Sequence, residues 1–227
     1  MAQITSGIRR VLSLPAAYDA LQRLLGSVRG RERLYRDYIA PQLGDVVVDV
    51  GCGTAAILDL IPDHVRYFGF DLSDKYIAAA RARYGNRGEF HCADITAIAA
   101  DVVPASTTTL AIGLLHHLGD DGCRHLLRAI RDRLAPGGRL ITLDGTFVPH
   151  QGWMSRTLVA ADRGRNIRTP DAYAALVPDG MSVTTHVLND LLRMPYAHCI
   201  LVCTKDAVAR SGAGRVPDPV SSLAQQR

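Results

Sequence analysis

The chain has 227 residues, of which 48% are hydrophobic and 21% charged, a composition that predicts a globular protein with a sizeable core and excludes disorder over most of its length. Its formal net charge of +4 comes from basic residues spread along the chain, so it gives little reason to expect a nucleic-acid partner. No stretch reaches the ~20 uninterrupted apolar residues of a membrane helix, and basic and proline residues interrupt the N-terminal segment, so we expect a cytoplasmic protein with no membrane partner.

The five cysteines give no sign of a metal site or a disulfide framework. Their number is odd, and no two of them form the C-x-x-C pair that zinc sites and redox motifs use. We expect reduced thiols and no metal.

The first predicted elements are short helices. Residues 7–40 carry apolar side chains at helical spacing, and breaks at Pro15, Gly26 and Gly30 divide the segment into two or three helices. We interpret residues 1–44 as an N-terminal helical cap. Its apolar faces need a surface, which is either the open mouth of the domain that follows or a second copy of the chain in a homodimer.

Strands and helices alternate from residue 45 onward. The run VVVDV has the β-branched character of a strand buried on both faces, and a glycine-containing turn follows it. Strands are expected at 46–50, 66–70, 89–92, 107–115 and 139–144, and helices at 55–61, 74–84 and 122–138. This order predicts an α/β fold of the Rossmann-like, doubly wound type, with a mostly parallel sheet between two layers of helices.

The alternation loosens after residue 144. Helices are expected at 153–163 and 171–177, and strands at 182–188 and 197–203, which a short turn-rich gap joins into an antiparallel hairpin. We interpret residues 145–180 as an insertion that forms a lid over the ligand. The domain would span residues 45–205, with 206–227 as a flexible tail.

Polar and glycine residues follow three successive strands. In an open parallel sheet the ligand lies beyond the carboxyl ends of the strands, so these positions are candidates for a binding site. They are Asp49, Gly51, Cys52 and Gly53 around the end of the first strand, Asp71 after the second and Asp94 after the third. The glycines let a ligand approach the backbone, and a carboxylate at Asp71 can accept both hydroxyls of a ribose.

Two cofactor classes fit this turn. The sequence GCGTAA over residues 51–56 satisfies the relaxed dinucleotide fingerprint, so NAD and an NAD-linked oxidoreductase are one interpretation. Asp49 favours the other class, because its carboxylate would repel a pyrophosphate but attract a cofactor that carries an ammonium and a sulfonium. We therefore expect S-adenosylmethionine rather than NAD.

Five segments then carry a likeness to a known family. VVVDVGCGTAAIL, FGFDLSDKYIAAAR, HCADI, IGLLHHL and LAPGGRLIT occur in this order within residues 30–145. Together they resemble the successive motifs of the class I S-adenosylmethionine-dependent methyltransferases, particularly the small-molecule methyltransferase branch. The resemblance implies a seven-stranded sheet whose last strands form an antiparallel hairpin.

The resemblance also implies which residues bind S-adenosylmethionine. The set runs from the methionine to the adenine: Gly113 and Leu114, the turn of Asp49, Gly51, Cys52 and Gly53, Asp71 on the ribose, Leu72 on the adenine face, and Asp94 with Ile95 at the adenine edge. Ala55 stands where the family usually has a third glycine, and threonines at 107–109 replace a common acidic residue; we expect both departures to be tolerated. Taken singly, Asp71 and Asp94 could instead cap the helices that follow them.

His116 and His117 are the candidates for a general base. They follow the fourth strand, where the transferred methyl should lie, and histidine has a pKa suited to accepting a proton. In-line displacement at a sulfonium methyl depends mainly on positioning, so a base is needed only for a protonated acceptor. We prefer His117. The alternative is that one histidine packs under the following helix and the other bonds a loop carbonyl.

Aromatic and basic residues outside these motifs are the candidates for acceptor binding. The first group is Tyr18, Tyr35, His150, Trp153, Tyr173, Tyr196 and His198, each of which could equally be a core or surface residue. Arg156, Arg163 and Arg168 lie in the insertion and would suit an anionic acceptor with a carboxylate or phosphate. A solvated helix face explains the same charges.

The predicted function is transfer of a methyl group from S-adenosylmethionine to a nitrogen or oxygen of a small-molecule acceptor, releasing S-adenosylhomocysteine. The alternatives are an NAD-linked oxidoreductase and a non-catalytic S-adenosylmethionine-binding protein. A nucleic-acid or protein methyltransferase is less favoured, because the chain lacks the N/D-P-P-Y/F-type element that accommodates flipped bases.

Overall fold

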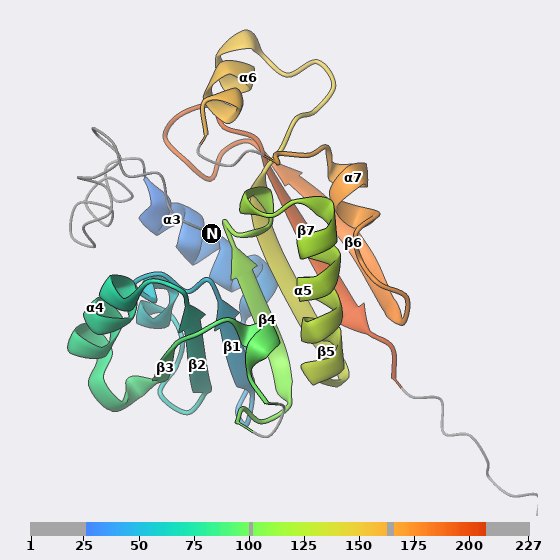
Figure 1. Cartoon of the computed structure of the whole chain (residues 1–227). Coiled ribbons are helices and arrows are strands. Elements are labelled where there is room, and N and C mark those ends of the chain that lie inside the picture. The colour runs from blue at the N-terminus through green and yellow to red at the C-terminus, as the bar shows by residue number, and fades with distance from the viewer. Residues whose placement is uncertain (1–25, 100–101, 163–165, 208–227) are drawn as a thin grey trace, which may run out of the picture.

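A computed structural model describes residues 26–99, 102–162 and 166–207 (Figure 1). Several expectations concern residues outside the described part of the chain. They are the helices before residue 26, the tail at 206–227 from residue 208 onward, and the acceptor candidates Tyr18 and Arg163. Within the described part, no helix is long and apolar enough to cross a membrane.

Seven strands form one sheet in the order β3-β2-β1-β4-β5-β7-β6. The strands are β1 (Val46–Val50), β2 (Arg66–Asp71), β3 (Glu89–Cys92), β4 (Ser106–Ile112), β5 (Leu134–Gly145), β6 (Met181–Leu188) and β7 (His198–Lys205). The first five are parallel, whereas β7 pairs antiparallel with both β5 and β6. The predicted fold class and the C-terminal hairpin are therefore confirmed.

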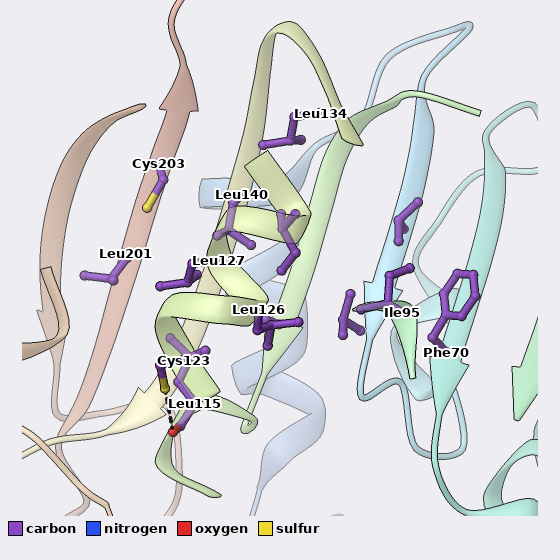
Figure 2. Packing of buried hydrophobic residues seen from close by; sticks show 14 of the residues in the cluster. Phe70, Ile95, Leu115, Cys123, Leu126, Leu127, Leu134, Leu140, Leu201 and Cys203 are labelled. Atoms are coloured by element: carbon purple, nitrogen blue, oxygen red, sulfur yellow. Dashed lines mark hydrogen bonds between the residues drawn. The ribbon is translucent and has the colours of Figure 1, made fainter. Parts of the chain in front are cut away.

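Helices cover both faces of the sheet. On one face lie α3 (Ser27–Leu34), the π-helical turn η1 (Tyr35–Ile39) and α4 (Asp74–Tyr84); α5 (Asp120–Arg133) and α7 (Pro170–Ala174) lie on the other. The residue spacing explains this division, because Leu126, Leu127 and Ile130 of α5 recur on one side of the helix and are buried. Figure 2 shows Leu126 and Leu127 in the same cluster as Leu140 of β5 and Leu201 of β7.

Short 3-10 turns connect these elements near the ends of the strands. They are η2 (Ala56–Asp59), η3 (Gly85–Arg87), η4 (Ile95–Ala97) and η5 (Leu115–His117). Cys123 fixes η5 against α5, because its Sγ donates to the carbonyl oxygen of Leu115 at 3.4 Å (Figure 2). The remaining helix, α6 (Trp153–Ala160), stands apart from the two helical layers in Figure 1.

Several predicted boundaries were wrong, and among them the helices expected at 153–163 and 171–177 end already at Ala160 and Ala174. The helix expected at 55–61 is only the turn η2, which starts after Ala55 in the left-handed region (φ 56°) and stops before Pro62. The helix expected to reach residue 138 ends at Arg133, because Pro136 restricts the residue before it to extended backbone, and β5 begins already at Leu134. The fourth strand ends at Ile112, since Gly113 turns with a φ of 68°.

Candidate functional site

The turn after β1 is tied to the end of β2. The backbone N–H groups of Gly51 and Cys52 both donate to the carbonyl oxygen of Phe70, at 2.7 and 3.0 Å. Gly51 and Gly53 have φ values of 75° and 55°, in the region where side chains with a Cβ are strained. The two glycines are therefore required by the path of this turn.

Asp71 joins the turn to the start of α4. Its Oδ2 accepts from the Gly53 N–H at 2.9 Å, and its Oδ1 accepts from the Ser73 N–H at 2.8 Å. The helix-capping role belongs to Ser73, whose Oγ accepts from the Tyr76 N–H. A carboxylate has about four lone-pair sites, so Asp71 retains acceptors for the two hydroxyls of a ribose.

An open space lies over this turn. A Cβ built on Gly53 would have no atom within 4 Å, and Leu72 next to Asp71 is 72% exposed. On the other side of the turn, a Cβ on Gly51 would lie 3.2 Å from Cδ1 of Leu114, so the segment after β4 closes against it. The turn thus presents exposed backbone between the Asp71 carboxylate and the side chains of Leu72 and Leu114, and we call this surface the ledge. Its shape fits an adenosine and its methionine group.

Asp49 lies buried below the turn. Its Oδ2 accepts from the hydroxyl of Tyr67 at 2.7 Å, and its side chain has little contact with solvent. Burial raises the pKa of Asp49 to about 7, with a smaller contribution from the charge of Asp71, while the Tyr67 hydrogen bond opposes the rise. A positive charge above the turn would therefore be met by a carboxyl group that ionises readily in its presence.

Burial also keeps the thiol of Cys52 neutral, because it raises the pKa of that thiol far above its usual value. Its Sγ donates weakly to the Gly53 carbonyl oxygen at 3.6 Å. Cys52 therefore has no nucleophilic role here and contributes shape to the turn.

Asp94 caps the turn η4 that follows β3. Its Oδ1 accepts from both the N–H and the Oγ1–H of Thr96, each at 2.8 Å. Ile95 is buried in the core with Phe70, so only its backbone could contact a cofactor. The Ala93 N–H donates to the Asp71 carbonyl oxygen at 3.1 Å, which places Asp94 at the same edge as Asp71.

His116 and Asp144 form a buried pair at the ends of β4 and β5. Nδ1 of His116 lies 2.7 Å from Oδ1 of Asp144, which also accepts from the His116 backbone N–H at 3.1 Å. Nδ1 is thus the ring nitrogen that faces Asp144, and Nε2 is the nitrogen on the other side of the ring. The ring lies beside Gly113, since a Cβ on Gly113 would lie 3.9 Å from its Cε1.

Asp144 is the site residue that sequence reasoning missed. It ends the run RLITLD, and β4 and β5 are parallel neighbours, so its position at a strand end was the available signal. Its Oδ2 is buried and has no hydrogen-bond partner among the described residues. His117, by contrast, is exposed, with its ring centroid 4.1 Å from that of His116.

Arg168 holds the turn that carries both histidines. Its guanidinium donates to the Asp120 carboxylate and to the carbonyl oxygens of Leu115, Leu118 and Asn166, at 2.8 to 3.2 Å. These five bonds use all five N–H donors of the guanidinium. The expectation that Arg168 binds an anionic acceptor is thus not supported by its surroundings, and Arg156 stacks over Phe147.

The aromatic candidates separate into two groups. Tyr35 packs against the core under α3, and Tyr173 is buried, donating its hydroxyl to the Gly145 carbonyl oxygen at 3.1 Å. His150, Trp153 and Tyr196 instead line one cleft beyond the end of β5.

His198 lies beside Tyr196, with ring centroids 4.7 Å apart. Burial lowers the pKa of His198 to about 4, and its Nδ1 has no partner among the described residues. Those residues also hold no group of three or more His, Cys, Asp or Glu side chains arranged to bind a metal.

Comparison with known proteins finds one family model that matches this part of the chain. Residues 47–138 match the family model described as a methyltransferase domain, a range that includes the turn after β1, Asp71, Asp94 and His116. A search of curated proteins found no match.

Solved structures share the fold at low sequence identity. The pyocyanin biosynthetic protein PhzM is 20% identical with a TM-score of 0.65, and human N-acetylserotonin methyltransferase, solved with SAM, is 18% identical with a TM-score of 0.63. The matches cover 84% and 85% of this chain but only 58% and 56% of those longer chains. The N-methyltransferase NodS from Bradyrhizobium japonicum is 14% identical with a TM-score of 0.60, over 78% of this chain and 94% of NodS.

The strand order, the ledge after β1 and the domain match agree with one another. The chain has the Rossmann-like fold of the methyltransferases, and this fold together with the match over residues 47–138 supports S-adenosylmethionine as the cofactor.

Proposed function

We propose that the protein transfers a methyl group from S-adenosylmethionine to a nitrogen or oxygen of a small-molecule acceptor, with His116 as the general base. The observation that carries the proposal is the buried His116–Asp144 pair beside Gly113, where the ledge for the methionine group ends. His116 replaces His117 as the preferred base, because the Asp144 carboxylate, 2.7 Å from its Nδ1, orients the buried His116 ring.

The proposed binding site uses the whole edge of the sheet. The methionine group would lie along the turn of residues 49–53 and against Leu114, the ribose on Asp71, and the adenine between Leu72 and the Asp94 segment. S-adenosylmethionine supplies a methyl group activated by a sulfonium. Residues 145–180 and the N-terminal helices would bind the acceptor and exclude water from it.

The chemistry required of the protein is limited. The acceptor lone pair forms a bond to the methyl carbon while the carbon–sulfur bond breaks, and the electron pair of that bond stays on sulfur, giving S-adenosylhomocysteine. A hydroxyl or ammonium acceptor must also lose a proton, and Nε2 of His116 would take it. Asp144 then faces a cationic imidazolium, which compensates its buried charge.

The test is a donor-turnover assay against pooled small phenols, alcohols and amines, with release of S-adenosylhomocysteine as the signal. We expect turnover with at least one pool and a loss of about 10²- to 10⁴-fold in kcat for His116→Gln, the usual range for a general base. The matched variant His117→Gln should stay within a few-fold of the wild type.

Two outcomes would contradict this proposal. If S-adenosylhomocysteine binds but no pool is methylated, the chain is a non-catalytic binding protein. If His117→Gln loses activity and His116→Gln does not, the base is His117 and the buried pair only supports the η5 turn. Calorimetric titration of both variants with S-adenosylhomocysteine controls for loss of cofactor binding.

A further inference from the structure

A cleft of about 380 Å³ opens beyond the carboxyl end of β5. One wall is residues 148–155, which lead into α6, and the other comes from Asn189, Pro195 and Tyr196 between β6 and β7. Its volume lies at the small end of the range of roughly 300 to 1,000 Å³ typical of ligand pockets. These walls are distant in sequence but adjacent in space, because β5 and β7 are paired neighbours.

The lining of this cleft is mostly apolar and holds no Asp, Glu, Lys or Arg among the described residues. Val148, Trp153, Met154 and Tyr196 present hydrocarbon or rings, and the polar lining side chains are His150, Gln151, Ser155 and Asn189. Two of these are paired with each other, since Gln151 Nε2 donates to Ser155 Oγ at 2.9 Å. An anion in the cleft would therefore lose its hydration with no lysine or arginine among the described lining residues to compensate it.

Two large apolar side chains remain open to solvent at this place. Trp153 is 78% exposed and Met154 is 48% exposed, at the start of α6. A tryptophan ring beside a concave apolar wall is a typical surface for stacking a flat ligand. Methionine adapts its shape to whatever packs against it.

Tyr196 links the cleft to the reacting end of the site. Its hydroxyl donates to Asp162 and lies directly against Gly145, where there is no room for a Cβ. Gly145 follows Asp144, the partner of His116. Tyr196 therefore both lines the cleft and packs against the end of β5, one residue beyond the partner of His116.

We propose that this cleft binds the body of the methyl acceptor and that the acceptor is an uncharged, flat, largely apolar molecule. The inference rests on the proposed function and changes the expectation from the sequence, which favoured an anion through the arginines of the insertion. The guanidinium of Arg168 is fully engaged by its own chain, and that of Arg156 stacks over Phe147 outside the lining of the cleft.

The chain provides its own probe, because Trp153 is its single tryptophan. Its emission can be titrated with 4-bromophenol, which is uncharged at pH 7 and quenches through its heavy atom, and with 4-bromobenzoate, an anion of similar size. We expect saturable quenching by the phenol and at least tenfold weaker binding of the benzoate. Met154→Ala should weaken the phenol at least threefold, whereas Leu43→Ala, which alters an 83% exposed residue outside the cleft, should not.

Several results would overturn the inference. One is binding of the benzoate that equals or exceeds binding of the phenol, and another is quenching by the phenol that does not saturate. A third is a Trp153 emission that changes with protein concentration in the absence of either compound, which would make the cleft an interface between two copies of the chain. The fluorescence requires no methyl transfer. Saturable binding of the phenol without turnover of any acceptor would thus refute the proposed function but support ligand binding in the cleft. Turnover of anionic acceptors alone would support methyl transfer but refute the proposal that the acceptor is uncharged.

Discussion

Replacement of Asp49 by asparagine tests the electrostatics below the cofactor turn. Burial raises the pKa of Asp49 from 3.8 to about 7, and at 1.36 kcal/mol per unit this difference amounts to about 4 kcal/mol. The folded state binds the proton more tightly than the unfolded state. The contribution of Asp49 to the free energy of unfolding should therefore be highest below pH 4 and decline as the pH rises through about 7.

Asp49→Asn removes this pH dependence and keeps an oxygen for the Tyr67 hydroxyl. The free energy of unfolding of the variant minus that of the wild type should rise by about 2 to 3 kcal/mol from pH 5 to pH 8. A pH-independent effect of the amide on stability does not change this rise. Urea unfolding at pH 5, 6.5 and 8 measures this difference. The electrostatic account is refuted if the stabilities of the two proteins change in parallel with pH.

The same carboxyl group should couple cofactor affinity to pH. The ammonium of S-adenosylhomocysteine favours the ionised form of Asp49, so wild-type affinity should weaken below pH 7, by at most tenfold per unit. In Asp49→Asn the affinity should be lower at pH 8 and nearly independent of pH. Calorimetric titration at the three pH values gives both numbers, and an unchanged affinity in the variant would show that Asp49 serves only the fold.

Three further substitutions probe other parts of the structure. Gly53→Ala places a Cβ in the open space above the turn at a φ of 55°, so S-adenosylhomocysteine should bind at least tenfold more weakly in calorimetric titration. Gly119→Ala is the control and should bind normally, because a Cβ there also has no atom within 4 Å but the φ is −65°. In Arg168→Lys the lysine cannot replace the five hydrogen bonds of the guanidinium, so the free energy of unfolding measured in urea should fall by about 2 kcal/mol. The variant should also lose more in kcat than in cofactor affinity. Equal losses in kcat and in affinity would contradict a role of Arg168 at the η5 turn. Burial lowers the pKa of His198 to about 4, so the stability that His198 contributes is present above pH 6.5 and is lost as the pH falls towards 4, by about 3 kcal/mol. His198→Gln should remove this part of the pH dependence of the free energy of unfolding, measured in urea. A variant that keeps the same pH dependence would refute the assignment.

The cofactor half of the molecule could be predicted from the sequence because its signals are local. Each parallel strand ends in a glycine or an aspartate or is followed by one within two residues, and the register brings Asp49, Asp71 and Gly113 to one edge. Element ends were less predictable. Ala55 adopts a left-handed backbone with no signal in neighbouring residues, and Pro136 restricts Ala135 but does not show that the sheet begins already at Leu134.

The acceptor half could not be predicted because its parts meet only through the sheet. The role of Asp144 depends on the pairing of β4 with β5, and the cleft depends on the pairing of β5 with β7. The basic residues of the insertion gave a misleading signal for the same reason. Nothing near Arg168 in the sequence shows that Leu115 and Leu118 present carbonyl oxygens to it.

The pairing of Gly145 with His198 has a consequence for how this fold can diversify. Leu188 of β6 also pairs with His198, so the ends of β5, β7 and β6 meet here, and the segments 146–180 and 189–197 outside the strands both start at this corner of the sheet. The cofactor ledge lies outside both segments, on β1, β2 and β4. Natural variation or grafting can therefore change these two segments without altering the strands that carry the cofactor ledge.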